Sequence, residues 1–192
     1  RGTIDAPDVV ADLNCKNIIY RDFTLDNLSL HSEMKPDSSF PSGFVNLKMD
    51  NGKWKNEKFD NGTLDISFSK ERMVVENFHF KFEDDYFILS GSWFSKNKYK
   101  IDKIQAAYRG NYLINSKPIF IAYQDTSILI EPFEIHINDG ILDGKLSIGN
   151  YSSGIFKMSN FDANVITRFI NNKYLNLSGI VFGELIFNSL DT

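Results

Sequence analysis

The residues that could carry acid–base or metal chemistry are few and far apart. The chain has three histidines, His31, His79 and His136, and their spacing does not match that of a metal site. His79 and His136 each lie between apolar residues of a predicted strand, so we expect their side chains on the polar side of a sheet. We interpret all three as solvated surface histidines rather than as ligands or catalysts.

An acidic run is the other candidate for chemistry. Glu83, Asp84 and Asp85 could bind calcium or exchange protons, but they follow Phe82 and precede the next apolar segment, which predicts a charged turn. Cys15 is the single cysteine, so an intramolecular disulfide and a cysteine-rich metal site are both excluded. The chain has no GxGxxG, GxxxxGK, GxSxG or HExxH motif. We therefore predict a protein that is not an enzyme and needs no cofactor or metal.

Composition indicates a sheet protein. The chain has 192 residues, of which 42% are hydrophobic, including 17 Phe. Ile is more common still, whereas Ala, the best helix former, is scarce. With 21 basic and 25 acidic residues and no basic cluster, nucleic acid is not an expected partner. The longest apolar stretches are too short for a membrane-spanning helix, so we expect none within the chain.

Apolar residues alternate with polar ones along the chain, which is typical of strands with one buried face. The clearest alternating segments are residues 9–15, 45–49, 64–68, 78–82, 87–93, 133–137, 146–148 and 181–187. Between them, residues 50–52, 60–62 and 138–140 contain Asn-Gly or Asn-Asp-Gly, which favours tight hairpin turns. We expect consecutive strands to pair antiparallel, with one obvious loop at residues 33–43.

One segment has the spacing of a helix. Phe161, Val165, Ile166, Phe169 and Ile170 would lie on one face, with Ser159 or Asn160 as N-cap. We predict a short amphipathic helix near residues 160–171 that packs on the sheet or closes the end of a barrel or groove.

A weak internal repeat relates residues 75–91 to residues 130–144. Each copy has an apolar residue followed by Glu, an alternating strand, an acidic turn and a strand that ends in Leu-x-Gly. Because a repeated sheet unit cannot close its own core, the repeat favours an extended sheet. We expect a single β-rich segment over residues 1–192, an excerpt of a longer repetitive protein, with a curved sheet rolled into an open groove. The alternative is a closed β-sandwich.

Several segments resemble the AsmA-like superfamily and, within it, the TamB family. The opening residues 2–9, Gly-Thr-Ile-Asp-Ala-Pro-Asp-Val, and the Tyr20-Arg21-Asp22 that ends the following strand are similar to the TamB repeat phrase. Strands around Leu89-Ser90-Gly91 and Leu142-Asp143-Gly144 resemble the hydrophobic-x-Gly-x-hydrophobic strands of that superfamily. The closing segment, a short helix followed by residues 175–187, is similar too. The resemblance covers nearly the whole chain, although its motifs are general turn and strand patterns.

The resemblance implies both a fold and a task. TamB-like proteins resemble a β-sheet rolled into a taco, anchored in the inner membrane of a diderm bacterium and spanning the periplasm. They are implicated in moving phospholipid toward the outer membrane and, with an Omp85-type partner such as TamA, in assembling outer-membrane proteins. A periplasmic segment that binds phospholipid acyl chains is the function that the resemblance implies for this chain, with the partner contacted through the parent protein.

Three hypotheses follow. The first is a non-enzymatic lipid conduit. The second is a scaffold or chaperone that pairs its sheet edge with client strands, and the third is a sandwich that binds sugars through Trp54, Trp93 and Tyr rings. In the first hypothesis the groove is lined by apolar residues on the predicted strands: Leu64, Ile66, Phe68, Phe78, Phe80, Phe82, Phe133, Ile135, Ile137, Leu146 and Ile148.

Overall fold

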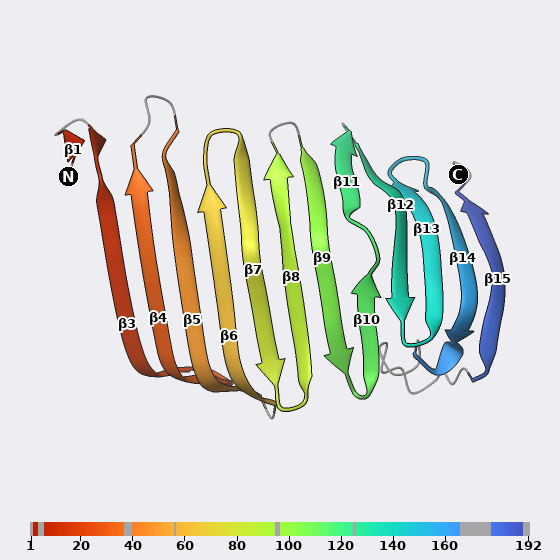
Figure 1. The fold of residues 1–192 in the computed structure, drawn as a ribbon, viewed down its shortest axis with the longest axis horizontal. Coiled ribbons are helices and arrows are strands. Elements are labelled where there is room, and N and C mark those ends of the chain that lie inside the picture. Colours follow the sequence, from red (N-terminus) through yellow and green to blue (C-terminus); the bar gives the residue numbers. More distant parts are fainter. Residues whose placement is uncertain are drawn as a thin grey trace. The chain divides into compact units, whose positions relative to one another are not determined.

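The computed structural model describes residues 2–3, 6–36, 40–55, 57–94, 97–124, 126–165 and 178–189. The chain divides into two compact units, Arg1–Ser95 (unit 1) and Lys96–Thr192 (unit 2). Antiparallel strands make up almost all of each unit (Figure 1). The predicted all-β fold, with curved and mainly antiparallel sheet, is therefore confirmed, and over the described residues neither unit closes into a barrel or a sandwich.

Unit 1 is a meander in which each strand of the main sheet pairs with the next one along the chain. Two short strands, β1 (Gly2–Thr3) and β2 (Ala6–Pro7), pair only with each other. The main sheet contains β3 (Val9–Tyr20), β4 (Phe23–Lys35), β5 (Ser42–Trp54), β6 (Glu57–Phe68), β7 (Arg72–Phe82) and β8 (Asp85–Phe94). These bounds confirm the alternating segments, and the loop before β5 is shorter than residues 33–43.

Two of the three predicted turns are wrong. Residues 50–52 lie inside β5 and residues 60–62 inside β6, while the chain reverses after Trp54, at Lys55. The register explains why these segments do not reverse the chain. Four residues lie opposite one another on neighbouring strands: Asn17, Asp26, Asn51 and Asp60. They leave a gap in the ladder of paired residues, but the pairing has the same register on both sides of the gap. Asn17 and Asn51 have φ of 54° and 47°, so they bend their strands where Asn tolerates a left-handed backbone.

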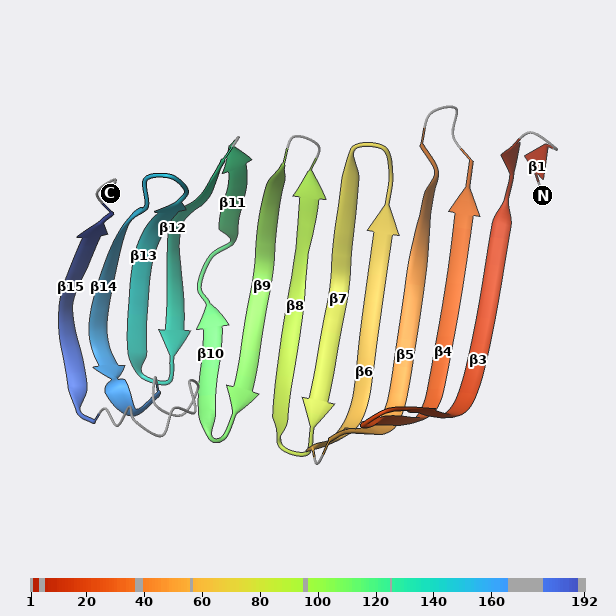
Figure 2. The same ribbon diagram turned by 180° about the vertical axis from the view of Figure 1, so that it is seen from behind.

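These four residues form a crease across the sheet. Figures 1 and 2 show β3 to β6 changing direction near the hairpin ends that lie beyond it. The part beyond the crease, residues 18–25, 52–55 and 57–59, is called the lip. Its Leu25 and Phe59 are the most buried apolar side chains of unit 1, at 2% and 3% exposure. The crease therefore folds the lip onto the apolar face of the sheet, where Phe59 meets Phe80 at 4.9 Å between ring centroids.

Unit 2 is also one antiparallel sheet, in the order β9, β10, β12, β13, β14, β15, with β11 continuing in the position of β10. Its predicted turn at residues 138–140 is confirmed between β12 and β13, with Asn138 at φ 52°. The strands are β9 (Lys98–Tyr108), β10 (Asn111–Asn115), β11 (Ile119–Gln124), β12 (Ser127–Ile137), β13 (Gly140–Ile148), β14 (Ser153–Asp162) and β15 (Ile180–Asn188).

The interruption between β10 and β11 is closed by one side chain. Asn115 is 8% exposed, and its Oδ1 accepts a hydrogen bond from the Ile104 N–H at 2.7 Å. Its Nδ2 donates to the carbonyl oxygens of Asp102 and Lys117 at 3.1 and 2.9 Å. The bonds with Ile104 and Asp102 satisfy backbone groups of β9 at the place where a continuous neighbour strand would have done so, and the bond with Lys117 fixes the connection itself.

The weak repeat corresponds to two matching hairpins, β7–β8 and β12–β13. In both, the register shifts at the residues after the first apolar position, between Val75 and Phe78 and between Ile130 and Phe133. Two residues of one strand thus oppose one residue of its partner, which defines a β-bulge. In each copy of the repeat, the residues that begin with Glu therefore form a bulge within one strand. They do not connect two separate strands.

The predicted helix begins later than expected. Residues 160–162 still belong to β14, and the chain is helical over residues 163–165. Asp162, rather than Ser159 or Asn160, is the N-cap, because its Oδ1 accepts a hydrogen bond from the Asn164 N–H at 2.9 Å. Residues 166–171 of the prediction lie outside the described residues. No helix among the residues that the structure describes is long and apolar enough to cross a membrane.

Candidate functional site

The apolar face of unit 1 is built from rows that cross the whole sheet. Residues directly opposite each other in antiparallel strands point to the same face. One row has a single apolar side chain from each of the six strands: Leu13, Leu30, Leu47, Leu64, Phe78 and Leu89. The next row toward the crease is Cys15, Leu28, Met49, Gly62, Phe80 and Phe87. The structure therefore places the predicted lining residues of β6 and β7 on one continuous apolar surface.

A phenylalanine ring covers Gly62 on this face. Gly62 lies opposite Phe80, and a Cβ at Gly62 would come within 2.8 Å of the Phe80 ring. Phe80 also meets Phe82 at 4.8 Å between centroids. Such ring pairs prefer tilted or edge contacts, as seen here. The result is a surface of aromatic and aliphatic groups without a polar side chain in these two rows other than the Cys15 thiol.

Apart from the lip, no second layer covers this face among the described residues. Apolar side chains of the two rows are half-buried by their lateral neighbours, and no side chain in the described chain is completely buried. A filled β-sandwich would bury the inward side chains of both sheets. The apolar face of unit 1 is therefore exposed enough to be touched by an apolar ligand.

The end of this face opposite the lip is a hollow of about 270 Å³. Phe68, Met73 and Trp93 follow one another across β6, β7 and β8 in its floor. Phe40 and Phe94 complete its apolar wall, and the turn from Ser69 to Arg72 forms its rim. The Arg72 guanidinium lies over the Phe94 ring, 5.3 Å from its centroid. This pair is one position beyond Met73 and Trp93 in the register, so it points to the other face, and Arg72 borders the hollow at the end of the sheet.

Unit 2 has an apolar face of its own. Phe133, Ile135 and Ile137 lie on one side of β12, and Leu146 and Ile148 lie on the same side of β13. Phe133 stacks edge-on against Phe156, 6.3 Å away. The remaining predicted lining residues therefore share one surface, within unit 2.

Part of this face is covered at one end. Val165, in the helical turn, is 3% exposed and packs in one cluster with Ile137 and Phe161. Leu113, Ile135, Leu142, Met158 and Val181 pack around that cluster. The prediction that the helix covers an apolar sheet surface is confirmed for its described part. At the other end Ile148 is 45% exposed, so the face is open there.

The opposite face of unit 1 is polar. Asp12, His31, Asn46, Asp65 and Asn77 follow one another across five strands. His31 Nδ1 lies 2.7 Å from Asp12 Oδ1, and Asn46 Nδ2 donates to Asp65 Oδ1 at 2.7 Å. The hydrogen bond with Asp12, followed by the charge of that carboxylate, raises the pKa of His31. This face is a hydrogen-bonded polar surface, and an acyl chain lying on it would have to desolvate polar side chains.

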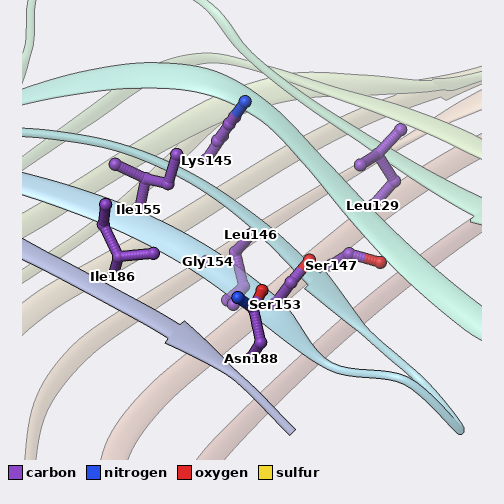
Figure 3. A pocket seen from close by; sticks show the side chains of 9 residues that line it. All are labelled: Leu129, Lys145, Leu146, Ser147, Ser153, Gly154, Ile155, Ile186 and Asn188. Carbon is purple, nitrogen blue, oxygen red and sulfur yellow. The ribbon is translucent and has the colours of Figure 1, made fainter.

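The opposite face of unit 2 is mixed. It has a hollow of about 440 Å³ in which Lys145, Ile155 and Ile186 form one row across β13, β14 and β15 (Figure 3). Ser147, Ser153 and Asn188 form the next row. Nearby, hydrogen bonds from the Ser116 side chain and from His136 lower the pKa of Glu134. Sequence alternation did not point to this hollow, because β13 to β15 have apolar residues on both faces.

The remaining candidates from the sequence occupy separate places. Glu83 and Asp84 form the turn between β7 and β8, as predicted, whereas Asp85, the third residue of the predicted turn, begins β8. Trp54 lies in the lip and Trp93 in the hollow, at opposite ends of the sheet, so they do not share one platform. The edge strand β15 has Ile180, Phe182, Leu185 and Ile186 more than half exposed. This edge is the feature on which the sheet-pairing hypothesis depends.

Fold and site together define an all-β protein whose antiparallel sheets separate an apolar face from a polar or mixed one. No family model, no curated protein and no solved structure matches the chain.

Proposed function

We propose that this chain is a non-enzymatic lipid-binding segment whose apolar sheet faces hold phospholipid acyl chains. The observation that carries the proposal is the row from Leu13 to Leu89, six apolar side chains from six strands with no second layer over them among the described residues. An acyl chain on this surface would gain about 0.8 kcal/mol for each CH₂ that it removes from water.

The same arrangement favours movement along the face over tight fixation. Each of the two rows is apolar from β3 to β8, so an acyl chain that moves from one strand to the next exchanges one apolar contact for another. Head groups would stay in water, where their charges keep their hydration. In line with the TamB-like resemblance, we propose that the parent protein guides phospholipid across the periplasm toward the outer membrane and supports outer-membrane protein assembly.

A charge in the central row tests this proposal. Leu64→Asp should abolish or strongly reduce co-purifying phospholipid in native mass spectrometry, because an acyl chain would have to desolvate the carboxylate. Thr63→Asp is the matched control. Thr63 lies on the polar face, opposite Lys48 and bonded by Asn77 Nδ2 at 3.0 Å, so a carboxylate is accepted there.

Ile135→Asp makes the same test on the apolar face of unit 2. Circular dichroism of each variant establishes that the sheet persists. Unchanged lipid binding by a folded Leu64→Asp chain, or an equal loss in Thr63→Asp, would contradict the proposal.

A further inference from the structure

We propose that unit 1 binds a phospholipid in one direction, with an anionic head group at Lys70 and Arg72 and the methyl end of the acyl chain toward Phe59. This inference rests on the proposed function and adds to it the charge and the orientation of the ligand. Two unlike ends of the apolar face support it.

The lip end is closed to a polar group. Phe59 is 3% exposed, lies 4.9 Å from Phe80 and stacks with Phe23 at 6.1 Å between centroids. Gly52, opposite Phe59, leaves the space that the ring fills, since a Cβ there would come within 2.0 Å of it. A head group at this end would have to displace packed rings and lose its hydration, whereas a methyl end would only add contacts.

The other end combines an apolar hollow with cations. Phe68, Met73 and Trp93 continue the apolar face to the rim, where Lys70 and Arg72 lie in the hairpin turn. Among the described residues neither of these two side chains has an ion-pair partner, and Glu71 is the only acid on the rim. Arg72 is held over Phe94 with its N–H groups still available. A guanidinium and an ammonium at the end of the sheet, bordering an apolar hollow, match a phosphate that is attached to an acyl chain.

The distance between the two ends suits one acyl chain. From Phe68 to Gly62, β6 advances about 20 Å, at roughly 3.3 Å per residue. One acyl chain spans about half of a hydrocarbon core of ~30 Å, or about 15 Å. A chain whose phosphate is at the rim therefore ends before it reaches the Phe59 ring.

Lipid titrations test the charge. Lysophosphatidylglycerol should bind the 192-residue chain about tenfold more tightly than lysophosphatidylcholine with the same acyl chain. Lys70→Gln with Arg72→Gln should remove this preference and leave the affinity for lysophosphatidylcholine within twofold. Lys53→Gln with Lys58→Gln is the matched control. These two lysines face each other across β5 and β6 in the lip, and their loss changes the net charge equally. Lys70→Gln alone, in an exposed turn, gives an intermediate preference if the double variant does not fold.

Tryptophan fluorescence tests the orientation. In a Trp54→Phe chain, Trp93 is the single tryptophan and lies beside the hollow. A quenching label near the head group of the lysolipid should quench Trp93 more than a label near the methyl end, and inorganic phosphate should not displace the lipid. The reverse order of quenching would overturn the orientation.

Three further outcomes would contradict parts of the inference. Equal affinity for the two lysolipids would overturn the anionic head-group site and leave acyl binding intact. Displacement by inorganic phosphate would make the rim a site for the free anion. Failure of both lysolipids to bind would overturn the proposed function itself.

Discussion

At the scale of single residues, the apolar faces depend on glycines that are paired with phenylalanines. Gly52 lies opposite Phe59, Gly62 opposite Phe80, Gly144 opposite Phe133 and Gly154 opposite Phe187. In each pair the ring occupies the space that a Cβ would take. The rings thereby lie flat on the sheet, and the surface remains smooth and apolar where a glycine would otherwise expose backbone.

This pairing predicts different effects on stability for two glycines of unit 2. In Gly144→Ala the new Cβ would lie 2.7 Å from Phe133 Cζ and 2.9 Å from Phe156 Cδ1, so the rings must move. We expect a loss of about 1–3 kcal/mol in the free energy of unfolding, measured by urea denaturation. Gly183→Ala is the control, because nothing lies within 4 Å of its Cβ position, and it should be neutral or slightly stabilising. Equal effects of the two would contradict this account.

His31 makes the polar face of unit 1 sensitive to pH. Because Asp12 raises the pKa of His31, the folded state favours the protonated ring. This stabilisation is fully present below the unfolded pKa of about 6.5 and is lost as pH rises through the folded pKa. Asp12→Asn should lower the pKa of His31 in an NMR titration, whereas Asp26→Asn, on the same strand as His31, should not. An unchanged His31 pKa in Asp12→Asn would contradict the assignment.

At the scale of elements, alternation predicts strands well but does not distinguish a bend from a reversal. Asp-Asn-Gly at residues 50–52 has the composition of a hairpin turn, yet it lies in a strand. Its neighbour across the ladder, residues 60–62, has the same composition, and the two bend together. A residue pattern read one strand at a time cannot show that the positions of positive φ align across strands, and that alignment is what makes the crease.

The crease gives a prediction for Asn51. A β-branched residue at φ 47° is strained by roughly 1–2 kcal/mol. Asn51→Val should therefore destabilise the sheet by about that amount and increase amide exchange in the lip, at residues 57–59. Lys53→Val is the control on the same strand, where φ is not positive and Val suits a strand. Equal lip exchange in the two variants would show that Asn51 does not hold the crease.

At the scale of the whole molecule, most of the topology could be predicted from the sequence because the strands pair locally along the chain. Within each unit most strands pair with a sequence neighbour, so composition, alternation and turn chemistry determine most of the topology. The lining residues Phe78 and Phe133 could be assigned to apolar faces because side chains alternate with period two. The hollow at Phe68 and Trp93 could not, because it depends on which rows coincide across three strands and on the distant Phe40.

The connection between β10 and β11 in unit 2 can change in length without changing the register of the sheet. Asn115 satisfies the backbone of β9 by itself, so the ladder does not depend on how many residues join β10 to β11. Residues added between Lys117 and Pro118, beyond the bond from Asn115 to the Lys117 carbonyl, would form a longer surface loop and would leave every apolar side chain of β12 on its original face. Insertions can therefore accumulate at this position without changing the apolar surface, and a reporter group can be introduced there.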